Sequence, residues 1–393
     1  MTRRKTILAL LLALMLIASA CGGDGGGEAT GDPIVIGAIF DLSGPTADVG
    51  TPYSEGVLAY IDWLNGEGGI DGRPIEVKHQ DYQYDVAQAE TLYSQFVSEG
   101  AVAFMGWGTG DTEALRTRVT DDEIPFMSAS YSEALTNPAE TPYNFVVGTS
   151  YSDQMRVALK WIDDNFDGHA EISVFHHDSP FGTSPVADGE SYISDEGYDM
   201  GYAAYPMPGG VTDYIAELSQ AQSQGVTHVI VQNVSSPAAT LAKNIAEQGL
   251  DVTMICLNWC ADEGFVNLAG AAAEGVHGVL PFGSPSSGGS GFDIADEWLV
   301  DNGSSLDAKG LHFTQGWWSM AAMAEAIKEV VDSGDDVTGP NIKAALESIS
   351  GFDTGGVTVD IGFSEDSHKG MPGASVFQVE DGIWTKVADE LKP

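Results

Sequence analysis

The sequence contains few basic residues: 16 Lys and Arg stand against 58 Asp and Glu, which gives a formal net charge of −42. Three of these bases (Arg3, Arg4 and Lys5) lie at the extreme N-terminus. A surface this acidic repels nucleic acid and anionic membranes, so we exclude both as partners of the general surface. The same composition suits a saline habitat, because salt screens the repulsion between like charges.

Catalytic and metal-binding motifs are also missing. The chain has no G-x-S-x-G elbow and no H-E-x-x-H segment. His176 and His177 are adjacent on a predicted strand, where neighbouring side chains point to opposite faces and do not easily grip one ion. We therefore expect no enzyme, no metal and no cofactor.

One long apolar run, Ile7 to Ile17, follows the basic N-terminus. It is shorter than the ~20 residues that span a bilayer, and the pattern is typical of an export signal over residues 1–20. The segment ends in "ASAC", which is similar to a lipobox, and a Gly-rich stretch follows. We predict lipidation of Cys21, a flexible tether over 21–33 and anchoring to the outer side of the cell membrane. The alternative is a cleaved signal that leaves a free protein.

Cysteine is scarce, with three residues in the whole chain. Beyond Cys21, only Cys256 and Cys260 remain, within "CLNWC". An extracytoplasmic location allows them to pair, whereas a gap of three residues is short for a disulfide. The sequence leaves both alternatives open.

Strand-like and helix-like segments alternate along the rest of the chain, which predicts an α/β fold with parallel sheets. The order repeats after Gly148, so we expect two lobes of similar design that close like a clamshell. We assign residues 34–149 and 282–372 to the first lobe, and residues 150–281 and 373–393 to the second. The tail has hairpin character, with a turn at Asp381 and Gly382. The predicted strands are 34–40, 74–81, 101–106, 124–130, 144–148, 171–178, 227–233 and 252–258, and the predicted helices are 54–69, 86–100, 111–121, 152–166, 183–196, 212–224, 237–248 and 314–334.

A glycine-rich turn, "GWGTGD" at 106–111, lies between a predicted strand and a predicted helix. Such turns bind anions, but Asp111 stands where a dinucleotide fingerprint needs glycine, and no Lys follows as in a P-loop. Nucleotide binding is therefore disfavoured. The free N–H groups of the helix start suit one carboxylate or carbonyl oxygen, and the alternative is a tight turn without a ligand.

Polar and aromatic residues follow several other predicted strands, in "SASYSEA" (128–134), "HHDSPFGTS" (176–184), "QNVSSP" (232–237) and "LNWC" (257–260). The carboxyl ends of strands in two facing lobes form the usual ligand cleft. For Ser132 the alternative is a role as a helix N-cap only. The predicted ligand-binding residues are Trp107, Thr109, Gly110, Ser130, Tyr131, Ser132, Phe181, Asn233, Asn258 and Trp259.

These segments together resemble the branched-chain amino acid (Leu/Ile/Val-binding) type of extracytoplasmic solute-binding proteins, which serve ABC importers. The resemblance rests on "IVIGAIFDLSGPTADVG" (34–50), "GGIDGRPIEVKHQD" (68–81), "FMGWGTGDTEAL" and "IPFMSASYSEAL". It implies a type I periplasmic binding protein fold with two Rossmann-like lobes and three crossovers. It also implies a monomer that delivers a small-molecule ligand to the transmembrane subunits of a permease.

In amino-acid binders of this type, the resemblance implies that the loops at 107–110 and 130–132 hold the α-carboxylate and part of the ammonium. The acid that pairs with the ammonium should fall near 257–260, where this chain has Asn258 and Trp259. We expect a small polar organic solute: an amino acid, an amide or urea-like compound, or an aromatic acid. The alternatives are a ligand-sensing receptor module of the same fold and, less favoured, a secreted two-domain enzyme.

Overall fold

The computed structural model describes residue 29 and residues 31–393. The predicted signal peptide, Cys21 and most of the predicted tether lie outside the described residues. Within the part of the chain that the structure describes, no helix combines the length and the apolar character needed to cross a membrane.

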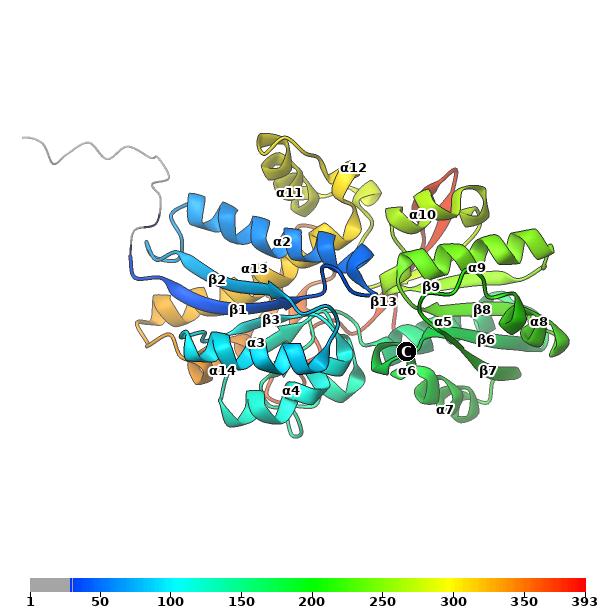
Figure 1. Ribbon diagram of the computed structural model, residues 1–393, viewed down its shortest axis with the longest axis horizontal. Coiled ribbons are helices and arrows are strands. Elements are labelled where there is room, and N and C mark those ends of the chain that lie inside the picture. The colour runs from blue at the N-terminus through cyan, green and yellow to red at the C-terminus, as the bar shows by residue number, and fades with distance from the viewer. Residues whose placement is uncertain (1–28, 30) are drawn as a thin grey trace, which may run out of the picture.

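The first lobe is built on a five-stranded sheet of order β2-β1-β3-β4-β5, in which every neighbouring pair is parallel. Helices α2, α3, α4, α13 and α14 cover it (Figure 1). The apolar strand β1 is almost wholly buried, as a central parallel strand between helices must be. The bounds are β1 Ile34–Phe40, β2 Ile75–Asp81, β3 Phe104–Gly106, β4 Phe126–Ser128, β5 Asn144–Phe145, α2 Ala47–Gly66, α3 Val86–Ser98, α4 Thr109–Asp121, α13 Leu311–Ser333 and α14 Gly339–Ser348.

The second lobe is built on a seven-stranded sheet of order β14-β13-β10-β9-β8-β6-β7. Strands β6 to β10 are parallel to one another, whereas β13 is antiparallel to both β10 and β14. The bounds are β6 Ala170–His177, β7 Met200–Met207, β8 His228–Gln232, β9 Thr253–Leu257, β10 His277–Leu280, β13 Ala374–Glu380, β14 Ile383–Leu391, α5 Tyr151–Asn165, α6 Pro180–Thr183, α7 Val186–Glu196, α8 Ile215–Ser223, α9 Ser235–Gln248 and α10 Glu263–Ala269.

The chain passes between the two sheets three times: after β5, after β10 and before β13. Figure 1 shows the two lobes side by side, with the loops that follow several strands of each lobe turned toward the other lobe. The segment between β10 and β13 returns to the first lobe and also contains α11 Ser290–Asp301, α12 Leu306–Lys309, β11 Ser350–Phe352 and β12 Ile361–Gly362. This is the predicted α/β fold of two lobes with three crossovers.

The predicted elements match the structure where hydrophobic periodicity was strong. Strand β1 has the predicted bounds, and the tail forms the predicted hairpin, with Asp381 and Gly382 at positive φ in its turn. The start predicted for α2 was wrong, because the helix begins at Ala47 and not at residue 54, and it continues through Pro52. Strand β7 was missed, because its "MGYAAYPM" sequence contains Gly and Pro.

Candidate functional site

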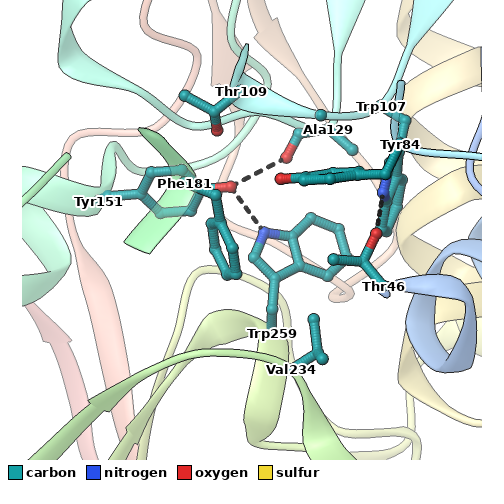
Figure 2. Close-up of a pocket in the computed structure, with 10 residues that line it drawn as sticks. Thr46, Tyr84, Trp107, Thr109, Ala129, Tyr151, Phe181, Val234 and Trp259 are labelled. Carbon is teal, nitrogen blue, oxygen red and sulfur yellow. Dashed lines mark hydrogen bonds between the residues drawn. The ribbon is translucent and has the colours of Figure 1, made fainter. Parts of the chain in front are cut away.

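An aromatic void lies between the two lobes (Figure 2). It comprises about 230 Å³ of space between protein atoms, part of it open to solvent. A space of this size suits a small solute. The lining residues are Thr46, Tyr84, Trp107, Gly108, Thr109, Ala129, Tyr151, Phe181, Val234 and Trp259.

The first lobe supplies five of these side chains from loops that follow its strands. Thr46 follows β1, Tyr84 follows β2, Trp107 and Thr109 follow β3, and Ala129 follows β4. Because the strands are parallel, all these loops lie at the carboxyl edge of one sheet.

The second lobe closes the other side of the void in the same way. Phe181 follows β6 in the short helix α6, Val234 follows β8, and Trp259 follows β9. Tyr151 is the first residue of α5, directly after the chain crosses between lobes. The void is thus formed by the carboxyl edges of two facing sheets.

Hydrogen bonds between lining residues join the two lobes. Trp259 Nε1 donates to Tyr151 Oη at 2.9 Å, and Tyr151 Oη lies 3.4 Å from the carbonyl oxygen of Ala129 (Figure 2). Farther out, the Ser236 N–H, in the first turn of α9, donates to Asp48 Oδ2 of α2 at 3.0 Å. These contacts hold the lobes in a closed arrangement.

The backbone around Tyr84 is unusual. Gln83 and Tyr84 both have positive φ, at 57° and 59°, in the left-handed region that residues other than glycine seldom occupy. The Gln83 N–H is bound by Asp81 Oδ1 at 2.9 Å, which helps to hold this turn after β2. The turn places the Tyr84 ring against the void, and strained backbone of this kind is concentrated at functional sites.

Steric limits explain most of the glycines in the "GWGTGD" turn. A Cβ on Gly106 would lie 2.1 Å from the Phe126 ring, and one on Gly108 would lie 2.3 Å from Asp111 Oδ1. A Cβ on Gly110 would meet Pro180 at an ordinary 3.7 Å. The first two glycines are therefore required by packing inside the first lobe, while Gly110 faces α6 of the second lobe.

Four of the ten predicted ligand-binding residues line the void: Trp107, Thr109, Phe181 and Trp259. Two more support it from behind. Ser130 Oγ lies 2.8 Å from Thr109 Oγ1, and the Tyr131 ring stacks on Trp259 with centroids 5.6 Å apart.

The other predicted residues have different surroundings. Gly110 lies next to the void on α4, and Ser132 Oγ donates to Glu113 Oε1 at 2.7 Å. Asn233 and Asn258, which we had expected to face the cleft, are absent from its lining: Asn233 Nδ2 lies 3.4 Å from Met207 Sδ, and Asn258 Oδ1 accepts from Gln315 Nε2.

The list of predicted ligand-binding residues missed six lining residues: Thr46, Tyr84, Gly108, Ala129, Tyr151 and Val234. The strand-end rule alone should have indicated Thr46 and Val234, since each lies in a loop after a predicted strand. Tyr84 and Tyr151 also follow predicted strands, 74–81 and 144–148, but the backbone turn and the crossover that aim them into the void are tertiary features.

Buried carboxylates lie behind the rings. Asp111 Oδ1 accepts from Tyr82 Oη at 2.7 Å, and burial raises the pKa of Asp111 to about 7. Asp41 Oδ2 accepts from Thr46 Oγ1 at 2.7 Å, and Thr46 Oγ1 in turn accepts from Trp107 Nε1 at 2.8 Å. Among the lining residues there is no charged side chain.

The thiols of Cys256 and Cys260 are free and buried, so the disulfide that the sequence allowed is not formed. Burial and the neighbouring Cys260 raise the pKa of the Cys256 thiol. Across residues 31–393 there is also no cluster of three or more His, Cys, Asp or Glu side chains suited to a metal ion.

Comparison with known proteins agrees with the two-lobed fold. The family model described as periplasmic binding protein matches residues 33–383, and the chain belongs to that family. A Leu/Ile/Val-binding protein homolog from Brucella suis is 24% identical over 91% of this chain and 93% of its own length. A leucine-, isoleucine-, valine-, threonine- and alanine-binding protein from Pseudomonas aeruginosa is 22% identical over 90% of this chain and 92% of its own.

Solved structures share the fold. A branched chain amino acid ABC transporter protein from Thermus thermophilus with bound valine superposes with a TM-score of 0.88 and 24% identity, covering 93% of this chain and 98% of that one. A fatty acid ABC transporter substrate-binding protein from Thermomonospora curvata superposes with a TM-score of 0.83 and 19% identity, covering 95% of each chain. Proteins that share this fold thus bear names that indicate very different ligands.

Proposed function

We propose that this chain is the extracytoplasmic substrate-binding lipoprotein of an ABC importer, which captures a small polar organic solute between two closing lobes. The observation that carries the proposal is the closed void, lined by Trp107 and Thr109 from one sheet edge and by Phe181 and Trp259 from the other. A ligand that touches both lobes stabilises the closed form, since it shifts the balance by its differential affinity for the two states.

Several features support this reading. The lobes meet through hydrogen bonds that opening would break, such as Ser236 to Asp48. The relatives' names describe binding and transport proteins. The lobes proposed are residues 34–149 with 282–372 and residues 150–281 with 373–393. The chain acts as a monomer that delivers its ligand to permease subunits.

A thermal-shift panel of amino acids, amides, urea and aromatic acids tests the proposal, because binding to the folded state raises the melting temperature by mass action. At 100 times Kd, the ligand should add about 2.7 kcal/mol to the unfolding free energy. Trp107→Leu and Phe181→Leu, one from each lobe, should each weaken the binding. Phe166→Leu, at an exposed aromatic in the second lobe, is the matched control. Binding that survives both site variants would remove this void from the function.

Membrane anchoring and delivery have their own tests. Cys21→Ser should move the protein from the membrane fraction to the soluble fraction, and an unchanged distribution contradicts lipidation at this residue. Ligand-loaded protein should stimulate the ATPase of its importer in proteoliposomes more than ligand-free protein does. A response of a signalling partner in place of transport would favour the sensory alternative.

A further inference from the structure

The lining of the void is rich in aromatic rings, which indicate the chemical class of the ligand. This inference rests on the proposed solute-binding function. The rings of Tyr84, Trp107, Tyr151, Phe181 and Trp259 surround one space (Figure 2). Several polar atoms of these rings are already engaged. Trp107 Nε1 donates to Thr46, Trp259 Nε1 donates to Tyr151, and the Tyr151 hydroxyl reaches a backbone carbonyl. A ligand therefore meets π surfaces more than hydrogen-bond donors.

Buried carboxylates lie behind the rings, and the His312 cation stacked on Trp259 is paired with Asp262 and adds no net charge. Asp41 connects to Trp107 through the Thr46 hydroxyl, with hydrogen bonds of 2.7 and 2.8 Å. Asp111, bound to Tyr82, has an Oδ2 atom that is buried without a partner. No Lys or Arg lines the void, and burial lowers the pKa of the neighbouring His177, which favours its neutral form. The electrostatic environment therefore favours a cation over an anion.

A primary ammonium does not fit this environment well. It brings three N–H donors, which need acceptors once they are removed from water. Neither Asp111 nor Asp262 lines the void, and Asp262 is paired with His312 at 3.0 Å, so the lining offers no carboxylate oxygen to an ammonium. An ammonium whose hydrogens are replaced by methyl groups keeps its charge and needs no acceptor, and aromatic rings bind such groups through cation–π attraction.

We infer that the void is an aromatic cage for a methylated ammonium group on a small solute. The Thr109 hydroxyl, at the first residue of α4, lines the same void and can bind an oxygen of the solute while it contacts Ser130 Oγ at 2.8 Å. A compact zwitterion with a quaternary ammonium at one end and a carboxylate at the other satisfies both features.

Isothermal titration of the mature protein, freed of bound solute by unfolding and refolding, tests this inference. The probes are glycine betaine and 3,3-dimethylbutanoate, which have the same shape but carry nitrogen and carbon, respectively, at the branched centre. Glycine betaine should bind at least about tenfold more tightly, because only its positive charge is attracted to the rings. Equal binding of the two probes would overturn the cage, since shape alone would then explain the affinity.

The methylation series glycine, sarcosine, dimethylglycine and glycine betaine gives a second measurement. Affinity should rise with each methyl group, whereas an ammonium site that uses hydrogen bonds gives the opposite order and contradicts the inference. Trp259→Leu should reduce the affinity for glycine betaine at least about tenfold, and Trp259→Phe should reduce it less. Phe166→Leu should leave it unchanged.

The outcomes also separate this inference from the proposed function. If leucine, an amide or urea binds while no methylated ammonium compound does, the solute-binding function stands and the cage is wrong. If no compound of either panel binds to the refolded protein, both fall.

Discussion

His312 Nε2 lies 3.0 Å from Asp262 Oδ2, and both side chains are buried. His312 belongs to the first turn of α13, which packs against α2 of the first lobe. Asp262 caps α10 of the second lobe, where its Oδ1 accepts from the Phe265 N–H. The ion pair thus joins the lobes behind the void, and the Trp259 ring stacks on the imidazole with centroids 5.1 Å apart.

This pair makes the stability of the closed form depend on pH. Burial alone lowers the pKa of His312, but the carboxylate of Asp262 outweighs it and holds the pKa above its ordinary value. The stabilisation is therefore fully present below the unfolded pKa of about 6.5 and is lost as the pH rises through the raised folded pKa. Burial raises the pKa of Asp262, but its contacts, led by His312, lower the pKa by more, so it lies below the ordinary value. The stabilisation that the Asp262 carboxylate provides is therefore lost only in stronger acid, as the pH falls through this lowered pKa.

His312→Gln should flatten the fall in melting temperature above pH 6.5 and lower the unfolding free energy at pH 6 by about 3 kcal/mol, because it leaves a buried carboxylate without its cation. Denaturation curves from pH 6 to 9 measure both effects. His169→Gln is the matched control, since His169 also faces two carboxylates but is exposed. A pH profile that His312→Gln leaves parallel to the wild type would contradict the role of this pair.

The two glycines that flank Thr109 should respond differently to alanine. Gly108→Ala places a Cβ 2.3 Å from Asp111 Oδ1 and 2.4 Å from Tyr82 Oη, so we expect a loss of about 1–3 kcal/mol from overpacking. Gly110→Ala lies in the first turn of α4 and meets nothing closer than 3.7 Å, so its stability should stay equal or rise by up to about 1 kcal/mol. Urea unfolding midpoints compare them, and equal losses would contradict this packing account.

Cys256 and Cys260 should behave as free but protected thiols. Because both are buried, a thiol reagent should label neither in the folded protein and both after unfolding in urea without reductant. Mass spectrometry counts the labels on these two residues. A folded protein that releases no thiol on unfolding would show that the disulfide forms after export.

Salt should stabilise the folded protein, because its net charge of −42 is screened more strongly as ionic strength rises. The melting temperature should increase between 0.1 and 1 M NaCl, where the Debye length falls from about 10 to about 3 Å. Calorimetry measures the change. The same melting temperature at both concentrations would end the hypothesis of adaptation to saline surroundings.

The sequence alone predicted much of the fold, because alternating apolar strands and helices are local patterns. The apolar run at 34–40 and the tail hairpin at Asp381 and Gly382 needed no tertiary information. The strand-end rule also indicated Trp107, Phe181 and Trp259, since residues after parallel strands gather at one edge.

Only the tertiary structure decided which polar groups face the void. Asn258 bonds to Gln315, which is 57 residues away, and Asn233 turns to Met207, so both leave the lining. Tyr84 enters it through two left-handed residues, and Tyr151 enters it at the crossover between lobes. Local sequence determines which segments form strands and helices, whereas the direction of a buried polar side chain depends on the partner that satisfies its hydrogen bonds, and that partner is brought close only by folding.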